Sequence, residues 1–202
     1  MAIKSLKHSS LTDNAFYRSV LAGNGAYFPV YESDDFLEEV VLSSDTATVS
    51  FTGLGSYSDY KHLQIRAVGQ VNQTNDSLHN IFMRLNSDTG NNYAQHLLYG
   101  QGSSVIAGGN ASTNFMYVRN VFGSKANTAY AGSVVIDFLD IHSSSKNTTM
   151  RGFGGTTQPG ENQIGITSGL WNNTAAVTTI LLYLNSGSFS AGARFSLYGS
   201  KG

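Results

Sequence analysis

Cysteine is absent from this chain of 202 residues, which excludes a disulfide framework and any cysteine-ligated zinc or iron–sulfur site. Charge is also scarce, since Asp, Glu, Lys and Arg together make up 12% of the residues, where about 25% is usual. The net charge of −1 gives no long-range field that would attract DNA or an anionic membrane surface. We therefore expect no binding to nucleic acid.

Long apolar segments are missing as well. No run approaches the roughly 18 apolar residues that a membrane helix needs, so we expect no membrane insertion. Lys4 and Lys7 are not followed by the apolar region of a secretory signal, and the lack of cysteine fits synthesis in a reducing cytosol.

Gly, Ser, Thr and Asn take the place of the missing charges, and the chain has only 2 prolines. Soluble surfaces made of uncharged polar residues are typical of proteins that bury much of their outside against neighbours. The composition therefore favours a subunit of a larger assembly.

Residues 1–36 differ from the rest of the chain, and we expect them to form an arm. Residues 9–24 predict one short helix, with Thr12 as its N-cap and Gly23 at its end. The helix has too few apolar residues to be stable alone, so it should dock on a neighbouring subunit. The expected docking residues are Phe16, Tyr17, Val20, Leu21, Tyr27 and Phe28.

An acidic cluster follows the predicted helix. It consists of Glu32, Asp34, Asp35, Glu38 and Glu39. A charge cluster of this kind is usually the solvated face of a linker. The alternative is that it belongs to an arm that grips a neighbouring subunit.

From Glu38 onward, apolar and polar residues alternate with the period of two that indicates β-strands. The clearest predicted strands are 46–52, 62–67, 81–85, 92–99, 115–122, 134–138, 163–168, 177–184 and 193–198. Turn-rich breaks separate them, among them 100–114 and 152–160. About ten short strands with almost no helix predict an all-β, antiparallel β-sandwich with a jelly-roll-like topology. We assign 1–36 to the docking arm and 37–202 to the sandwich domain.

Residues that could carry out catalysis do not converge in the sequence. The segment 165–169 has its serine one position too late for a nucleophile elbow. Glycoside hydrolysis needs two convergent carboxylates, but Asp137 and Asp140 lie three apart on a strand and so face opposite sides. Asp140 and His142 share a face and suit a metal, but no third ligand lies nearby. We therefore expect no catalytic residue, no metal and no cofactor.

Glycan binding remains a hypothesis for one polar turn. Sugar sites on β-sandwiches often use an aromatic ring as a stacking platform beside amide side chains. Trp171, the only tryptophan, is followed by Asn172 and Asn173 and is the candidate for such a contact. The alternative is that Trp171 covers the core or an oligomer interface.

Four segments, which together span about residues 17–199, carry a resemblance to known proteins. They are 17–24 with Tyr27 and Pro29 after it, 60–66, 84–93 and 195–199. These segments resemble small β-rich, jelly-roll-like structural or tail-fibre-type proteins in the virions of tailed bacteriophages.

The resemblance implies a non-enzymatic virion structural protein, made in the host cytoplasm, in the tail-fibre or tail-tip adhesion assembly. It implies docking through the N-terminal arm, with other virion proteins and further copies of the chain, expected as a trimer, for partners. A host surface glycan is a further expected ligand. The alternatives are a capsid decoration or head-fibre protein and, in a different class, a glycan-degrading enzyme.

The second of these segments predicts a strand with two different faces. Leu63 and Ile65 point to one side, where they can enter a core. Tyr60, His62, Gln64 and Arg66 point to the other side. We expect this polar, aromatic-containing strip to face solvent or a neighbouring subunit.

Overall fold

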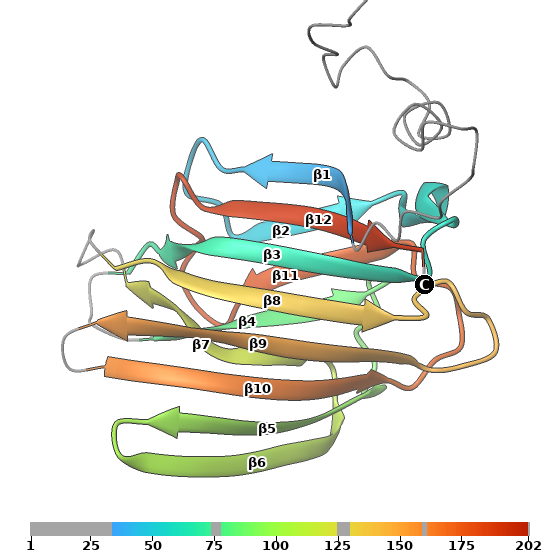
Figure 1. The fold of residues 1–202 in the computed structure, drawn as a ribbon. Coiled ribbons are helices and arrows are strands. Elements are labelled where there is room, and N and C mark those ends of the chain that lie inside the picture. The colour runs from blue at the N-terminus through green and yellow to red at the C-terminus, as the bar shows by residue number, and fades with distance from the viewer. Residues whose placement is uncertain (1–33, 74–77, 125–129, 159–160, 202) are drawn as a thin grey trace, which may run out of the picture. The chain divides into compact units, whose positions relative to one another are not determined.

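The computed structural model describes residues 34–201 apart from 74–77, 125–129 and 159–160 (Figure 1). Within these residues, the regular structure consists of strands and one short 3-10 helix, Leu54–Tyr57. The predicted arm helix and its docking residues Phe16, Tyr17, Val20, Leu21, Tyr27 and Phe28 lie outside the described residues. None of the described segments is a helix long and apolar enough to cross a membrane.

The strands pair into a large sheet and a small sheet. The large sheet has the order β1 (Asp35–Val41), β12 (Arg194–Ser200), β3 (His62–Val71), β8 (Gly132–Leu139), β9 (Thr148–Gln158), β10 (Glu161–Trp171), β5 (Tyr93–Gln101) and β6 (Ser104–Thr113). The small sheet has the order β2 (Thr48–Thr52), β11 (Thr179–Leu184), β4 (His79–Leu85) and β7 (Met116–Ser124). Pairing within each sheet is antiparallel, and a short parallel contact between the ends of β3 and β7 joins the two.

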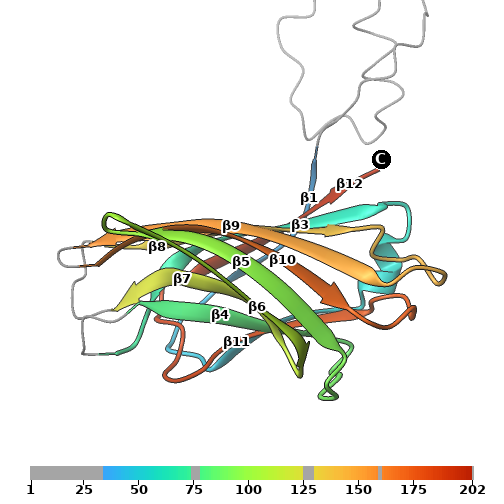
Figure 2. The same ribbon diagram turned by 90° about the horizontal axis from the view of Figure 1, so that it is seen from below.

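The two sheets form two layers with the hydrophobic core between them (Figure 2). The core contains a cluster of three phenylalanines, Phe122, Phe189 and Phe195, whose ring centroids lie 5.0 to 6.2 Å apart. Contacts of this kind add about 0.5–1.5 kcal/mol each beyond the burial of the rings. The two antiparallel layers and the core between them confirm the predicted all-β, antiparallel sandwich.

Burial alternates along β3 as the sequence predicted. Leu63, Ile65 and Ala67 are buried, whereas Arg66 is exposed. Because the period of a strand is two, this pattern turns one side of β3 toward the core and the other away from the small sheet.

Two segments that the sequence predicted as turn-rich breaks are strands. Residues 100–114 contain β6, and residues 152–160 contain most of β9. The prediction was wrong because both segments are rich in glycine, which usually marks loops. In β9 the glycines instead allow close contact between strands.

The acidic cluster lies largely in a strand. β1 begins at Asp35 and pairs with β12, so it spans the predicted boundary between residues 36 and 37. Two of its acidic side chains bond to neighbours: Asp35 accepts a hydrogen bond from Tyr60, and Glu39 accepts one from Ser196. Hydrogen bonds and ion pairs, rather than solvation alone, hold Asp34, Asp35 and Glu39, whereas Glu32 lies outside the described residues.

Gly152 shows why the small sheet can approach the large one so closely. It lies on the buried side of β9, and a Cβ atom there would come within 2.5 Å of Cγ2 of Val118 in β7. Val118 is fully packed and cannot move aside easily, because protein interiors are as dense as organic crystals.

We predict that Gly152→Ala destabilises the protein by about 1–3 kcal/mol, the usual effect of overpacking a core. Gly100→Ala is the matched control, because its new Cβ would lie no closer than 3.8 Å to any atom. The control should change the free energy of unfolding by less than about 0.5 kcal/mol. Urea denaturation monitored by circular dichroism measures both, and equal stability of the two variants would contradict the packing argument.

Candidate functional site

The side of the large sheet that faces away from the small sheet, here called the outer face, carries a line of apolar side chains. Cross-strand pairing places five of them side by side on successive strands: Ala107 (β6), Leu98 (β5), Ile166 (β10), Phe153 (β9) and Val135 (β8). We call these residues the apolar row. Leu98, Ile166 and Phe153 are 44%, 51% and 53% exposed. An antiparallel sheet that faces water on one side normally presents polar residues there, so this line is unusual.

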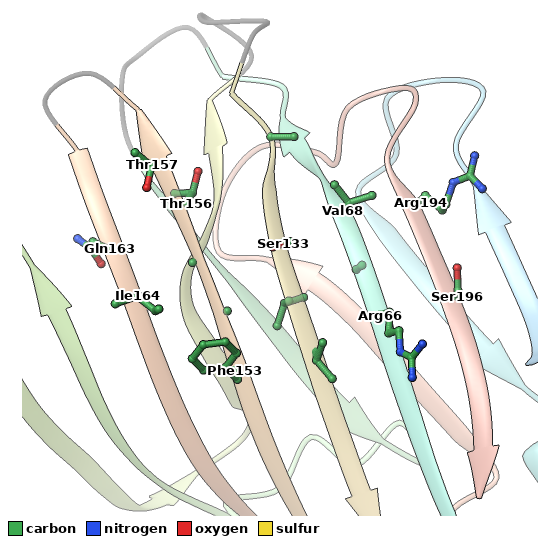
Figure 3. A pocket seen from close by; sticks show the side chains of 16 residues that line it. Arg66, Val68, Ser133, Phe153, Thr156, Thr157, Gln163, Ile164, Arg194 and Ser196 are labelled. Atoms are coloured by element: carbon green, nitrogen blue, oxygen red, sulfur yellow. The ribbon is translucent and has the colours of Figure 1, made fainter. Parts of the chain in front are cut away.

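A neighbouring row on the outer face extends the apolar surface. Ile164 and Val68 lie here with exposures of 57% and 43%, and Gly155 and Ser133 lie between them on β9 and β8. Between the two rows is a shallow hollow of about 630 Å³. Figure 3 shows Phe153 and Ile164 on one side of this hollow, and Val68, Arg66 and Arg194 on the other.

On the other side of the apolar row runs a polar row. It consists of His96, Ser168, Arg151, Asp137 and Gln64, again paired across successive strands. The amide of Gln64 donates to Oδ1 of Asp137 at 2.7 Å, and Nη2 of Arg151 lies 3.9 Å from Oδ2 of the same carboxylate. A second hollow of about 440 Å³ lies here, lined by Phe153 and Ile166 together with His96, Asp137 and Arg151.

Ion pairs border the outer face at β1, β12 and β3. Arg66 contacts Asp34 at 2.7 Å, and its guanidinium lies 4.2 Å from the ring centroid of Tyr198. Arg194 contacts Glu39 at 3.2 Å. Partly exposed pairs such as these contribute only about 0–1 kcal/mol each. They therefore form a charged border on one side of the apolar surface and add little to stability.

The predicted polar strip on β3 is divided in the structure. His62, Gln64 and Arg66 lie on the outer face, as the alternation predicted. Tyr60 precedes the strand, packs against the core, and donates its hydroxyl hydrogen to Oδ2 of Asp35 at 2.7 Å. Three of the four strip residues therefore share the face that carries the apolar row.

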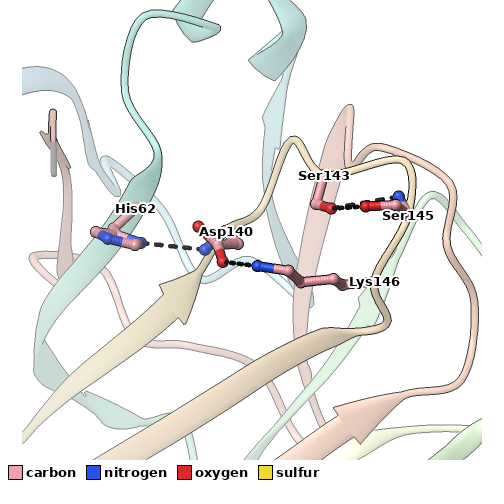
Figure 4. Close-up of polar contacts among 5 residues, drawn as sticks. All are labelled: His62, Asp140, Ser143, Ser145 and Lys146. Carbon is pink, nitrogen blue, oxygen red and sulfur yellow. Dashed lines mark hydrogen bonds and ion pairs between the residues drawn. The ribbon is translucent and has the colours of Figure 1, made fainter.

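Asp140 and His142, the residues considered for metal binding, directly follow the end of β8. The backbone N–H of Asp140 donates to Nδ1 of His62 at 3.1 Å, and Nζ of Lys146 donates to Oδ2 of Asp140 at 2.9 Å (Figure 4). The hydrogen bond from Lys146 lowers the pKa of Asp140, and burial lowers the pKa of His142. The carboxylate of Asp140 thus has a lysine partner, and the described part of the chain contains no cluster of three His, Asp or Glu side chains that could hold a metal.

The structure corrects the hypothesis of a glycan contact at Trp171. The indole is 1% exposed, stacks on Tyr93 at a centroid distance of 6.5 Å, and donates its Nε1–H to Oδ2 of Asp88 at 2.7 Å. A ring in the core is not available as a platform for a sugar. Asn172 and Asn173 are exposed, but their side-chain oxygens accept hydrogen bonds from Asn147 and from the backbone of Ala175.

Sequence reasoning missed Phe153, Ile164 and Ile166. The two isoleucines belong to a predicted strand, where the alternation suggests that they point into the core. In the structure the two sides of β10 are the reverse of this expectation. Gln163 and Thr167 point inward, and the isoleucines point outward. The available signal was Trp171, which has the same parity as Gln163 and Thr167 and is the largest side chain to bury.

No protein-family model and no curated protein matches this chain. Among solved structures, the IT-sialidase CBM40 of Ruminococcus gnavus bound to alpha2,3 sialyllactose is similar, with 8% identity and a TM-score of 0.34, over 81% of this chain and 92% of that chain. The marine PL-14 alginate lyase of Aplysia kurodai is similar with 10% identity and a TM-score of 0.35, over 83% of this chain and 80% of that chain. These similarities concern the fold alone.

The hydrogen bond between Trp171 and Asp88 predicts a pH dependence of stability. This bond, with those from Asn92 and Gly90, lowers the pKa of Asp88 below its ordinary value of 3.8. A carboxyl group with a lowered pKa in the folded state stabilises the fold above its unfolded pKa, and this stabilisation is lost as the pH falls through the folded value.

Asp88→Asn should therefore lower the free energy of unfolding at pH 7 by about 1 kcal/mol, a small value because the carboxylate is largely solvated. The difference from the parent protein should shrink at pH 3, which lies below the ordinary pKa of 3.8, because Asp88 then takes up a proton on unfolding. Asp59→Asn, at an exposed turn residue, is the control and should have little effect at either pH. Urea denaturation at the two pH values tests this, and a difference that does not change with pH would count against it.

Proposed function

We propose that this protein is a non-enzymatic structural subunit of a tailed-bacteriophage virion, and that the outer face is buried against a neighbouring protein of the particle. The observation that carries the proposal is the apolar row. Leu98, Ile166 and Phe153 present large apolar side chains to solvent on three adjacent strands. Contiguous exposed apolar surface with a polar border is typical of sites that bind other proteins.

The layout of the outer face supports a protein partner. The apolar row runs from β8, in the middle of the large sheet, to the edge strand β6, and the ion pairs of Arg66 and Arg194 lie toward the opposite edge. Protein interfaces commonly have this anatomy, in which the buried centre is poor in charge and the rim is polar. The phage context itself comes from the sequence resemblance.

The carboxylates of the outer face support a structural role. Asp137 accepts from Gln64 and lies near Arg151, while Asp140 is paired with Lys146. These partners link strands or loops to one another. Loss of polysaccharide-cleaving activity in variants of Asp137 and Asp140 would favour the alternative of a glycan-degrading enzyme.

The position in the particle is part of the proposal. We favour the tail-fibre or tail-tip adhesion assembly, with capsid decoration or a head fibre as the alternative. Docking through residues 1–36 and a trimeric state stay predictions. Labelling intact particles with an antibody against this protein and imaging them would distinguish head from tail.

The central test is a reattachment assay with virions that lack this protein. We predict that Ile166→Asp reduces binding to such virions at least about tenfold, because a charge in the apolar row would be buried without a partner. The variant should still fold, since Ile166 is 51% exposed.

The matched control is Ser168→Asp, which adds the same charge on the same strand and the same face, but in the polar row. It should reattach like the parent protein. If Ile166→Asp also reattaches normally while folded, the apolar row is not the docking surface.

A second candidate function is glycan binding on the outer face. The observation that favours it is the surroundings of Phe153, whose exposed ring borders both hollows. In the smaller hollow it lies with His96, Asp137, Arg151 and Ser168, which can donate and accept hydrogen bonds. An aromatic ring beside such polar groups suits a sugar, and an adhesion protein needs such a contact.

If this candidate is right, Phe153→Ala should weaken binding of purified host surface polysaccharide by about tenfold or more, equivalent to about 1.4 kcal/mol. Phe36→Ala is the control, because Phe36 is 60% exposed and lies on β1, away from both hollows. Isothermal titration calorimetry measures the affinities. Equal loss in both variants, or no binding by the parent protein, would rule out this site.

A further inference from the structure

The strands at the edges of the sheets differ in how well they are protected. Within the described residues, β1 and β6 pair on one side only in the large sheet, and β2 does so in the small sheet. β7, at the other border of the small sheet, pairs with β4 and also has the short parallel contact with β3. β6 forms one border of the large sheet, next to β5 (Figure 1). Unpaired backbone N–H and C=O groups along such a border are a template for another strand, so natural proteins usually block them.

Two of the three edges carry recognisable safeguards. β1 has seven residues, contains Asp35, Glu38 and Glu39, and has a register shift between Phe36 and Glu38. Its acidic side chains would repel the same strand of a second copy. β2 has only five residues. Short length, like-charged side chains and a bulge each discourage a new strand from pairing.

β6 has none of these safeguards over most of its length. It contains ten residues, from Ser104 to Thr113, with no charged residue and no proline. Seven of them, 104–110, pair with β5 without a register shift, and the single irregularity follows Asn110. Eight of the ten are exposed, and Val105 is the most exposed large hydrophobic residue of the described chain at 77%.

We infer that β6 pairs antiparallel with β6 of a second copy of this chain across a two-fold axis. A neutral strand can meet its own copy without repulsion, and a two-fold axis makes one surface serve both partners. Pairing would satisfy the outward backbone groups of both strands and extend the large sheet from one copy into the next. It would also give Val105 a neighbouring side chain.

The apolar row supports a second copy as the occupant of this edge. The row ends at Ala107, which lies on β6 itself, so pairing of β6 brings the apolar rows of two copies toward each other. The result is one apolar surface that spans both copies. This inference does not rest on the proposed function, because the pairing requires no virion and no glycan.

The test uses the full chain in sedimentation velocity at concentrations of about 1–100 μM, the range in which weak and moderate protein contacts form. Val105→Lys combined with Ala107→Lys places two positive charges on one face of β6, next to the same charges of the partner. We expect this variant to have half the mass of the parent protein. If residues 1–36 also join copies into an oligomer, the pairing of β6 doubles the mass of that oligomer. The β6 variant is then still expected to have half the mass of the parent protein.

The matched control is Thr48→Lys combined with Ser50→Lys, which adds the same charges to exposed positions of the other edge strand, β2. The control should keep the mass of the parent protein. A monomeric parent protein, or a β6 variant with unchanged mass, would overturn the inference.

A cysteine scan gives a second readout that does not depend on destabilising the contact. The chain has no cysteine, so single cysteines at positions 105 to 109 report only on contacts that they make themselves. Antiparallel pairing across a two-fold axis brings one position close to its own copy, and a disulfide needs Cα atoms about 4.4–6.8 Å apart. We expect cross-linked dimer to peak at one position under mild oxidation. Uniformly low cross-linking across the scan would refute pairing through β6.

Discussion

The burial of Trp171 is the constraint on which the outer face depends. Its indole is enclosed between the sheets, stacked on Tyr93 and bonded to Asp88. Burial also raises the pKa of Tyr93 to about 12, so its hydroxyl keeps the proton that it donates to the carbonyl oxygens of Leu85 and Asp88. Replacing a buried tryptophan by alanine commonly costs about 3–5 kcal/mol, which shows how strongly such a residue can fix a strand.

Because side chains alternate along a strand, the position of Trp171 decides the rest of β10. Gly169, Thr167 and Gln163 must point inward, and Ile166 and Ile164 must point outward. The opposite register would place isoleucines against β7, where space is limited. A Cβ atom on Gly169 would already come within 2.7 Å of Sδ of Met116. The exposed isoleucines thus follow from the packing of the core on the other side of the sheet.

The same constraint explains how much of the molecule could be predicted from the sequence. The alternation in β3 and its buried Leu63 and Ile65 were predictable, because the hydrophobic pattern there agrees with burial. β9 was missed because its glycines look like loop residues, and the close contacts of Gly152 with β7 and of Gly155 with β10 depend on tertiary packing. The exposed isoleucines of the outer face were missed because the alternation of apolar and polar residues does not by itself show which side of β10 is buried. That choice depends on Trp171 and on partners far away in the sequence.

The central claim is that β10 turns its isoleucines outward and that a neighbouring protein then covers them. Thiol labelling tests both parts in a chain that has no cysteine of its own. In the isolated protein, Ile166→Cys should react rapidly with a maleimide, whereas Thr167→Cys, at a position that is 4% exposed, should react slowly. In assembled virions the cysteine at position 166 should become at least about tenfold less reactive, as expected for burial at the centre of an interface. Rapid labelling at position 167 rather than 166, or unchanged labelling at 166 after assembly, would contradict the account.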